Sequence, residues 1–347
     1  MKKQRYKNLI YFQNGSIGDF LMTIFFLENI HLNDNSLVLN VVVPKNFYFL
    51  QQFLEKYPYI NLVLANRKSL KGLRGILKLT KFAFSKNLII TAPTAGKLSL
   101  YIKIIAKKIS LFGRGELVGF EDGQKINKFI YTKLLKYNTK IIYSDFLKTV
   151  IRELGFEVKK ETLFIDYTED CGVLKEFGIE ENNYIVLHTQ GSTTSRSLDK
   201  TKISSLIKFI QSINISVKII LTGGPEDKKF LDEFTLLFKN VLVCSNLRFI
   251  KLCNLIDKSK LFIGIDTGTT HLASFLQKKS LVIAHPITAS NWLPFYNLNA
   301  TILYTIKNCQ HNIHCGREYL EKYCKGILMC FEHTALDIVE NKLKDLL

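Results

Sequence analysis

Short apolar runs alternate with amphipathic helical patterns from one end of the chain to the other. The runs are rich in branched aliphatic and aromatic residues and predict strands at Leu9–Phe12, Leu37–Val43, Leu62–Ala65, Leu88–Thr91, Tyr184–Thr189, Lys218–Thr222, Val241–Cys244, Leu261–Ile265, Leu281–His285 and Thr301–Tyr304. Strands that alternate with helices indicate an α/β protein built on parallel sheets.

The chain divides most naturally near its middle. A polar, acidic segment at Asp166–Asp170 follows the helical pattern of Ser144–Gly155, so we expect one domain at 1–168 and another at 169–347. Apolar residues at helical spacing in Thr334–Leu346 predict a closing helix. Two doubly wound, Rossmann-like domains would place their ligand-binding loops at the carboxyl ends of strands, around a shared central cleft.

Composition limits the cellular setting. A chain of 347 residues that is 47% hydrophobic has enough apolar side chains for two cores. The apolar stretch behind the basic N-terminus stops at Phe12, too short for an export signal, and no run of about 18 apolar residues follows. The seven cysteines are an odd number, which favours reduced thiols. We therefore expect a cytoplasmic protein.

The net charge of +18 is concentrated in the first half. No acidic residue occurs from Lys56 to Gly115. Within that span, basic residues recur at helical spacing at Arg67, Lys71, Arg74, Lys78 and Lys81. Any single lysine is most simply a solvated surface residue, but the whole stretch favours an anionic partner, either an acidic membrane surface or a polyanion.

The first candidate loop, Asn14–Asp19, lies between a predicted strand and a helix. Its glycines, Gly15 and Gly18, do not complete a dinucleotide fingerprint. Asp19 falls near the start of the helix, where its carboxylate can face the cleft. A carboxylate there can equally stabilise the helix dipole.

Two loops of the second half offer groups for a nucleotide. Gln190–Arg196 follows a strand and carries hydroxyls and one cation, which suits a phosphate; an ordinary turn before a helix capped by Asp199 is the alternative. Glu226 and Asp227 follow a strand and a Gly-Gly-Pro turn, and their carboxylates can accept hydrogen bonds from ribose hydroxyls. Alone, that turn is a common one.

The fourth loop, Gly264–His271, opens a helix with small residues. Backbone N–H groups and the helix dipole at such a position can bind a diphosphate. A helix with Asp266 as its N-cap is compatible with this role.

Together these blocks resemble glycosyltransferase family 9, the heptosyltransferases of lipopolysaccharide core assembly. The resemblance rests on Gly15-Ser16-Ile17-Gly18-Asp19, Gly191-Ser192 with Arg196, Gly223-Gly224-Pro225, and Asp266-Thr267-Gly268 with His271. It implies a GT-B fold, with an N-terminal acceptor-binding domain and a C-terminal nucleotide-sugar-binding domain. One departure is that Arg196-Ser197-Leu198 stands where the family commonly has Lys-Arg-Trp or Lys-His-Trp. Arginine can neutralise a phosphate as lysine does.

The resemblance also implies roles for individual residues. Asp19 would be the catalytic base, in an acceptor-side loop with Gly15, Ser16 and Gly18. The donor would be held by Ser192, Thr193, Arg196, Asp227 with Glu226 as a near alternative, Leu247 under the adenine, Asp266 at the sugar, Thr267 and Gly268 at the diphosphate, and His271. The chain has no Asp-x-Asp pair, the usual seat of a metal–diphosphate bridge in the other major glycosyltransferase architecture. We therefore expect inverting transfer that requires no metal or other cofactor.

The implied reaction moves heptose from ADP-heptose to 3-deoxy-octulosonic acid or heptose on lipid A, at the inner leaflet of the cytoplasmic membrane. An alternative acceptor is an autotransporter protein, because some relatives modify such proteins and carry an iron-binding cysteine cluster. Here Cys309, Cys315, Cys324 and Cys330 fall within 22 residues, although their spacing is not that of common zinc sites. A nucleic-acid-binding protein and a dehydrogenase are weaker alternatives, since neither has its motif in the sequence.

Overall fold

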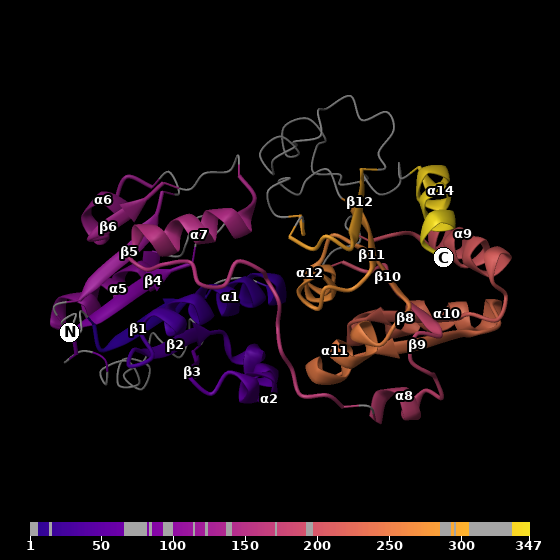
Figure 1. The fold of residues 1–347 in the computed structure, drawn as a ribbon, viewed down its shortest axis with the longest axis horizontal. Helices are drawn as coiled ribbons and strands as arrows, with labels where there is room; N and C mark the ends of the chain where they lie inside the picture. The colour runs from indigo at the N-terminus through magenta and orange to yellow at the C-terminus, as the bar shows by residue number, and fades with distance from the viewer. Residues whose placement is uncertain are drawn as a thin grey trace. The chain divides into compact units, whose positions relative to one another are not determined.

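The computed structural model describes residues 6–13, 16–65, 82, 85–92, 100–113, 115–121, 124–136, 141–170, 172–191, 197–284, 293–294, 296–304 and 335–347. They form two compact units, Met1–Thr162 and Leu163–Leu347 (Figure 1). The basic stripe expected at 67–81 and the four C-terminal cysteines lie outside the described residues. Among the described helices, none is both long enough and apolar enough to cross a bilayer.

Unit 1 is built on a parallel six-stranded sheet with the order β3-β2-β1-β4-β5-β6. Its strands are β1 (Asn8–Phe12), β2 (Val38–Val43), β3 (Ile60–Leu64), β4 (Asn87–Thr91), β5 (Glu116–Phe120) and β6 (Lys133–Leu135). The helical segments are α1 (Ile17–Asn33), η1 (Lys45–Phe49), α2 (Leu50–Phe53), η2 (Leu54–Lys56), α5 (Leu100–Phe112), α6 (Asn127–Ile130) and α7 (Tyr143–Glu153). Every residue of β1 and β4 is buried, as expected for central strands covered on both faces.

Unit 2 repeats this plan with the strand order β12-β11-β10-β7-β8-β9. Its strands are β7 (Tyr184–His188), β8 (Lys218–Gly223), β9 (Val241–Ser245), β10 (Leu261–Ile265), β11 (Ser280–Ala284) and β12 (Ala300–Tyr304). The helical segments are α8 (Gly172–Glu176), α9 (Lys200–Ile213), η4 (Pro225–Asp227), α10 (Lys228–Leu237), α11 (Phe249–Asp257), α12 (Gly268–Phe275) and α14 (Leu336–Leu346). The closing helix α14 packs on α9 through the buried side chains of Val339 and Leu343.

All ten strands expected from the apolar runs are present, to within two residues at either end. β5 and β6 were not expected. Their segments, ELVGF and KLL, are short and interrupted by glycine or lysine, so they do not stand out as apolar runs. The predicted cap of α9 is confirmed, because the Asp199 carboxylate accepts a hydrogen bond from the Lys202 N–H at 2.9 Å.

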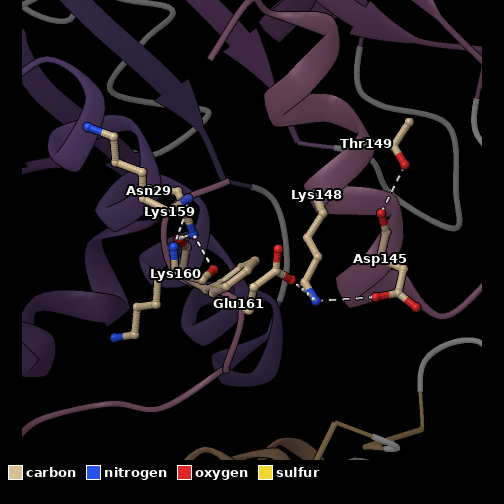
Figure 2. Close-up of polar contacts among 8 residues, drawn as sticks. Asn29, Asp145, Lys148, Thr149, Lys159, Lys160 and Glu161 are labelled. Atoms are coloured by element: carbon tan, nitrogen blue, oxygen red, sulfur yellow. Dashed lines mark hydrogen bonds and ion pairs between the residues drawn. The ribbon is translucent and has the colours of Figure 1, made fainter. Parts of the chain in front are cut away.

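A polar clamp fixes the end of unit 1 (Figure 2). The fully buried Asn29 of α1 accepts hydrogen bonds at Oδ1 from the N–H groups of Lys159 and Lys160, at 2.9 and 2.8 Å. Its amide nitrogen donates to the Lys160 carbonyl at 3.2 Å. Beside it, Lys148 of α7 pairs with Glu161 at 2.8 Å and with Asp145 at 3.5 Å. The segment leaving α7 is thereby tied back to α1 and α7.

The residues that follow belong to unit 2. The Ile165 N–H donates to the Phe275 carbonyl, and the Gln277 side chain donates to the Leu163 carbonyl. The Tyr167 hydroxyl donates to Asp257 at 2.8 Å. The chain therefore passes from unit 1 to unit 2 between Thr162 and Leu163, whereas the boundary expected from the sequence lies at 168.

Candidate functional site

The carboxyl ends of four neighbouring strands of unit 2 are aligned in one row. The register pairs Gly264 of β10 with His188 of β7, His188 with Thr222 of β8, and Thr222 with Cys244 of β9. The segments that follow these strand ends carry every candidate donor-binding residue. Segments far apart in the sequence thus form one sheet edge, the edge at which open α/β sheets bind ligands.

The row contains the point at which the winding of the sheet reverses. From β7 the chain proceeds outward through β8 and β9, then returns to β10 on the other side of β7 and continues through β11 and β12. Ligands of doubly wound sheets bind at such a reversal, because loops on its two sides diverge and leave a crevice. The chain leaves β7 at Thr189–Gly191 and β10 at Asp266–Thr267, on the two sides of this reversal.

The start of α12 can bind an anion. Thr267 is the N-cap, and its carbonyl accepts hydrogen bonds from the N–H groups of Thr270 and His271. Among the described residues, the N–H groups of Gly268 and Thr269 have no acceptor, as is usual for the first turn of a helix. These donors and the helix dipole favour a phosphate group. The suggested N-cap, Asp266, is wrong: that residue precedes the cap and is buried.

The loop after β7 is closed at its base. The Gly191 N–H donates to the Ser197 hydroxyl at 2.9 Å, and the Leu198 N–H donates to the Thr189 carbonyl at 3.0 Å. Ser192, Thr193 and Arg196, the candidate phosphate ligands, lie outside the described residues. The closed base nevertheless attaches their loop to the middle of the row.

The turn after β8 uses its two carboxylates differently. Asp227 accepts a hydrogen bond from the Gly224 N–H at 2.8 Å and so closes η4. The exposed Glu226 folds over Gly224, where a Cβ atom would lie only 2.6 Å from its carboxylate. Because the Asp227 carboxylate already stabilises the turn, the Glu226 carboxylate is the more available of the two for a ligand.

Leu247 lies next to that turn. It follows β9, is partly buried, and comes directly after Asn246, whose N–H donates to the Gly223 carbonyl at 3.1 Å. The backbone next to this apolar side chain is therefore bonded to the end of β8, where the turn with the two carboxylates begins.

Two polar pairs at this edge of the unit 2 sheet were not expected from the sequence. Nδ1 of His271 shares a hydrogen bond of 2.9 Å with the hydroxyl of Tyr296, whose ring packs edge-on against Phe275. Burial, and then the nearby charge of Asp266, hold the pKa of Tyr296 well above its ordinary value, so the phenol remains protonated. His271 was a candidate, but Tyr296 follows no motif that marks its role.

The second pair joins β7 to β8. Nδ1 of the buried His188 shares a hydrogen bond of 3.0 Å with the Thr222 hydroxyl. Burial lowers the pKa of His188 to about 4, against weaker opposing effects of hydrogen bonds to the backbone of Thr222 and Gln190. His188 is therefore neutral at pH 7. Its position at the end of a strand, just before a glycine-containing loop, was the available signal.

In unit 1 the corresponding reversal lies between β1 and β4, and the loop after β1 leads to Asp19. Asp19 is partly buried at the third position of α1. Its Oδ2 accepts hydrogen bonds from the Ser16 N–H at 2.7 Å and from the Ser16 hydroxyl at 3.2 Å. Among the described residues Oδ1 has no partner. The capping interaction thus holds one oxygen and leaves the other able to accept a proton.

The backbone around Asp19 is also fixed. The Thr23 hydroxyl is within hydrogen-bonding distance of the Asp19 carbonyl at 2.9 Å and of the Gln13 side-chain oxygen at 3.1 Å, which connects α1 to the end of β1. Gly18 is buried, Ser16 is exposed, and Gly15 lies outside the described residues.

The model of glycosyltransferase family 9 (heptosyltransferase) matches residues 107–322 of the sequence. The chain belongs to glycosyltransferase family 9. No curated protein sequence matches it. The family assignment makes the protein a glycosyltransferase, and it confirms the resemblance found in the sequence motifs.

Solved structures share this glycosyltransferase's fold at low sequence identity. A family 9 glycosyltransferase from Veillonella parvula is 16% identical with a TM-score of 0.68, and the match covers 94% of this chain and 98% of that one. The E. coli heptosyltransferase WaaC with ADP-2-deoxy-2-fluoro heptose is 13% identical with a TM-score of 0.62, over 92% and 99% of the two chains. The iron-containing dodecameric glycosyltransferase TibC from enterotoxigenic E. coli is 14% identical with a TM-score of 0.57, over 100% and 77%. The predicted α/β GT-B fold class is confirmed.

Proposed function

We propose that this glycosyltransferase moves heptose from ADP-heptose to a sugar hydroxyl of a lipid-linked lipopolysaccharide inner core, with inversion and without a metal ion. The observation that carries the proposal is the row of loops at the carboxyl edge of the unit 2 sheet. Four neighbouring parallel strands span about 14 Å, since adjacent strands lie ~4.8 Å apart. A nucleoside diphosphate has this length.

The loops along the row would meet the groups of the donor in turn. Leu247 after β9 would pack against the adenine, and Glu226 or Asp227 after β8 would accept hydrogen bonds from the ribose. Ser192, Thr193 and Arg196 would meet the diphosphate from one side of the winding reversal. Thr267 and Gly268 would meet it from the other, and Asp266 and His271 would lie toward the transferred sugar.

We assign the base to Asp19. Its free Oδ1 would take the proton of the acceptor hydroxyl as the hydroxyl oxygen attacks the anomeric carbon. The bond from that carbon to the diphosphate oxygen breaks on the opposite side, ADP leaves with the bonding electrons, and the configuration inverts. Arg196 and the unpaired N–H groups of α12 would stabilise the charge that develops on the departing diphosphate.

A second candidate acceptor is a protein. It is favoured by the four cysteines Cys309, Cys315, Cys324 and Cys330 and by the similarity of the fold to iron-containing TibC. These cysteines lie outside the described residues. Metal analysis of the purified protein, combined with lipid-linked and protein acceptors assayed in parallel, separates the two proposals.

Donor binding can be tested by calorimetric titration with ADP and ADP-heptose. We expect Arg196→Ala to weaken the affinity for ADP at least tenfold, because a hydrogen bond to a charged group contributes about 1.5–3 kcal/mol. The control Arg152→Ala removes an exposed arginine of α7 in unit 1 and should leave the affinity unchanged. Unchanged ADP affinity in Arg196→Ala would place the phosphate site elsewhere.

A further inference from the structure

The outward side of α5 is apolar. Ile102, Ile105, Ala106 and Ile109 face the core of unit 1. If the opposite side of α5 were in contact with water alone, its side chains should be polar. Instead, large apolar side chains are exposed there: Leu100, Ile104 and Leu111, the last at 64%. Phe112, the last residue of α5, is also exposed, at 71%.

The short helix α6 packs against α5. The two are joined through the fully buried Lys103 of α5, whose ammonium group donates to the Asn127 side chain at 2.6 Å. On α6, Phe129 is 82% exposed, and Ile126 at the N-cap of the helix is also exposed. Unit 1 thus presents six large exposed apolar side chains on two adjoining helices and the N-cap of the second, which we call the α5–α6 surface.

The α5–α6 surface is also cationic. Lys108, Lys125 and Lys128 are exposed, and Lys107 is partly exposed. Residues 100–136 contain eight Lys and Arg against three Asp and Glu. Apolar and aromatic side chains interleaved with lysines are typical of helices that lie in the interface of an acidic bilayer.

We propose that the α5–α6 surface docks unit 1 on an anionic lipid bilayer. Its apolar side chains would enter the interfacial region, while the lysines would remain at the level of the acidic headgroups. A second copy of the chain is a poorer occupant, because two such cationic surfaces repel each other and lysine is depleted at the cores of protein interfaces. The purpose of docking rests on the proposed function, since a lipid-linked acceptor is displayed on that bilayer.

The strength of docking should depend on both kinds of side chain. Each lysine near an acidic surface contributes about 1 kcal/mol, roughly a fivefold factor in partitioning. Salt weakens this part and leaves the apolar part, because it screens charge over about 10 Å at 0.1 M. We therefore expect binding to acidic vesicles that decreases with salt and is weak on neutral ones.

The test is sedimentation of the full chain with vesicles of phosphatidylglycerol and phosphatidylethanolamine, compared with phosphatidylcholine alone. The first variant combines Leu111→Ser, Phe112→Ser and Phe129→Ser. The matched control combines Ile215→Ser, Leu236→Ser and Leu237→Ser, which removes three exposed apolar side chains from unit 2. A second variant, Lys107→Gln with Lys108→Gln and Lys128→Gln, removes charge alone. Thermal unfolding and ADP titration establish that each variant is folded and binds nucleotide.

We expect wild type and control to sediment equally with acidic vesicles, and both α5–α6 variants to lose at least tenfold in partitioning while ADP affinity is unchanged. Failure of wild type to bind acidic vesicles, or undiminished binding by the variants, would overturn the proposal. The proposal would also be overturned if the wild-type protein bound no vesicles, was a dimer, and became monomeric in the serine variant. The α5–α6 surface would then join two copies of the chain. None of these readouts depends on catalysis, and transfer to a delipidated acceptor tests the proposed function separately.

Discussion

At Asp19, a structural and a catalytic role can coexist. The capping interaction with Ser16 occupies Oδ2 and aligns the carboxylate, while Oδ1 has no partner among the described residues. In the proposed reaction, helix capping and proton acceptance would use different atoms of one side chain. A substitution that keeps the shape of the side chain can separate them.

We predict that Asp19→Asn lowers the rate of transfer by about 10²–10⁴, the usual contribution of a general base. ADP affinity should stay at the wild-type value, because the nucleotide loops belong to unit 2. Asp145→Asn is a matched control, since it removes an acidic side chain from the first turn of another unit 1 helix. Wild-type turnover by Asp19→Asn would exclude this residue as the base.

His188 should make the stability of unit 2 depend on pH. Its pKa is about 4 in the folded protein and about 6.5 when unfolded, so the unfolded chain binds more protons between these values. The stabilisation is complete above pH 6.5 and decreases as the pH falls toward 4. We expect wild type to lose about 2 kcal/mol more than His188→Gln between pH 7 and pH 5, measured by chemical denaturation. Parallel stability curves for the two proteins would show that burial does not perturb this histidine.

At the scale of elements, Asn29 connects α1 to the segment that ends unit 1 (Figure 2). One buried carboxamide oxygen serves two backbone N–H groups, and its nitrogen donates to the carbonyls of Phe25 and Lys160. Few side chains offer both functions at this length.

We predict that Asn29→Ala lowers the free energy of unfolding by about 2–4 kcal/mol, because it leaves two backbone N–H groups without acceptors and opens a small cavity. Asn33→Ala is the control: it also loses a contact to this segment, with the Glu157 backbone, but in an exposed setting. Chemical denaturation compares the two. Equal losses would mean that burial of the clamp adds nothing.

Some elements of the fold could be predicted from the sequence alone and others could not. Central strands such as Leu261–Ile265 were predictable because burial on both faces demands a continuous apolar run. The edge-side strands β5 and β6 were not, since they carry Gly119 and Lys133 and depend on pairing with their neighbours. The same distinction applies to the residues of the candidate site. Asp19, Asp266 and Gly268 stand in motifs, whereas His188 and Tyr296 gain their environment only from segments brought beside them by the fold.

At the scale of the whole molecule, each unit brings its candidate residues to the carboxyl edge of its own sheet, at the point where the winding reverses. The proposed reaction requires both edges to act on one pair of substrates. In that proposal, Arg196 and the start of α12 would stabilise the charge on the departing diphosphate without a divalent cation.

We predict that exhaustive treatment with EDTA leaves the rate of transfer unchanged, because protein groups alone neutralise the leaving ADP. A metal-dependent glycosyltransferase treated in parallel is the control. Loss of activity that Mg²⁺ or Mn²⁺ restores would contradict this electrostatic account.

The most direct test of the central claim is the mass of a lipid-linked inner-core acceptor after incubation with the enzyme and ADP-heptose. The account predicts that the acceptor gains one heptosyl unit, that one ADP is released for each unit gained, and that Asp19→Asn slows both by about 10²–10⁴. An acceptor of unchanged mass beside wild-type protein that binds ADP-heptose would contradict it.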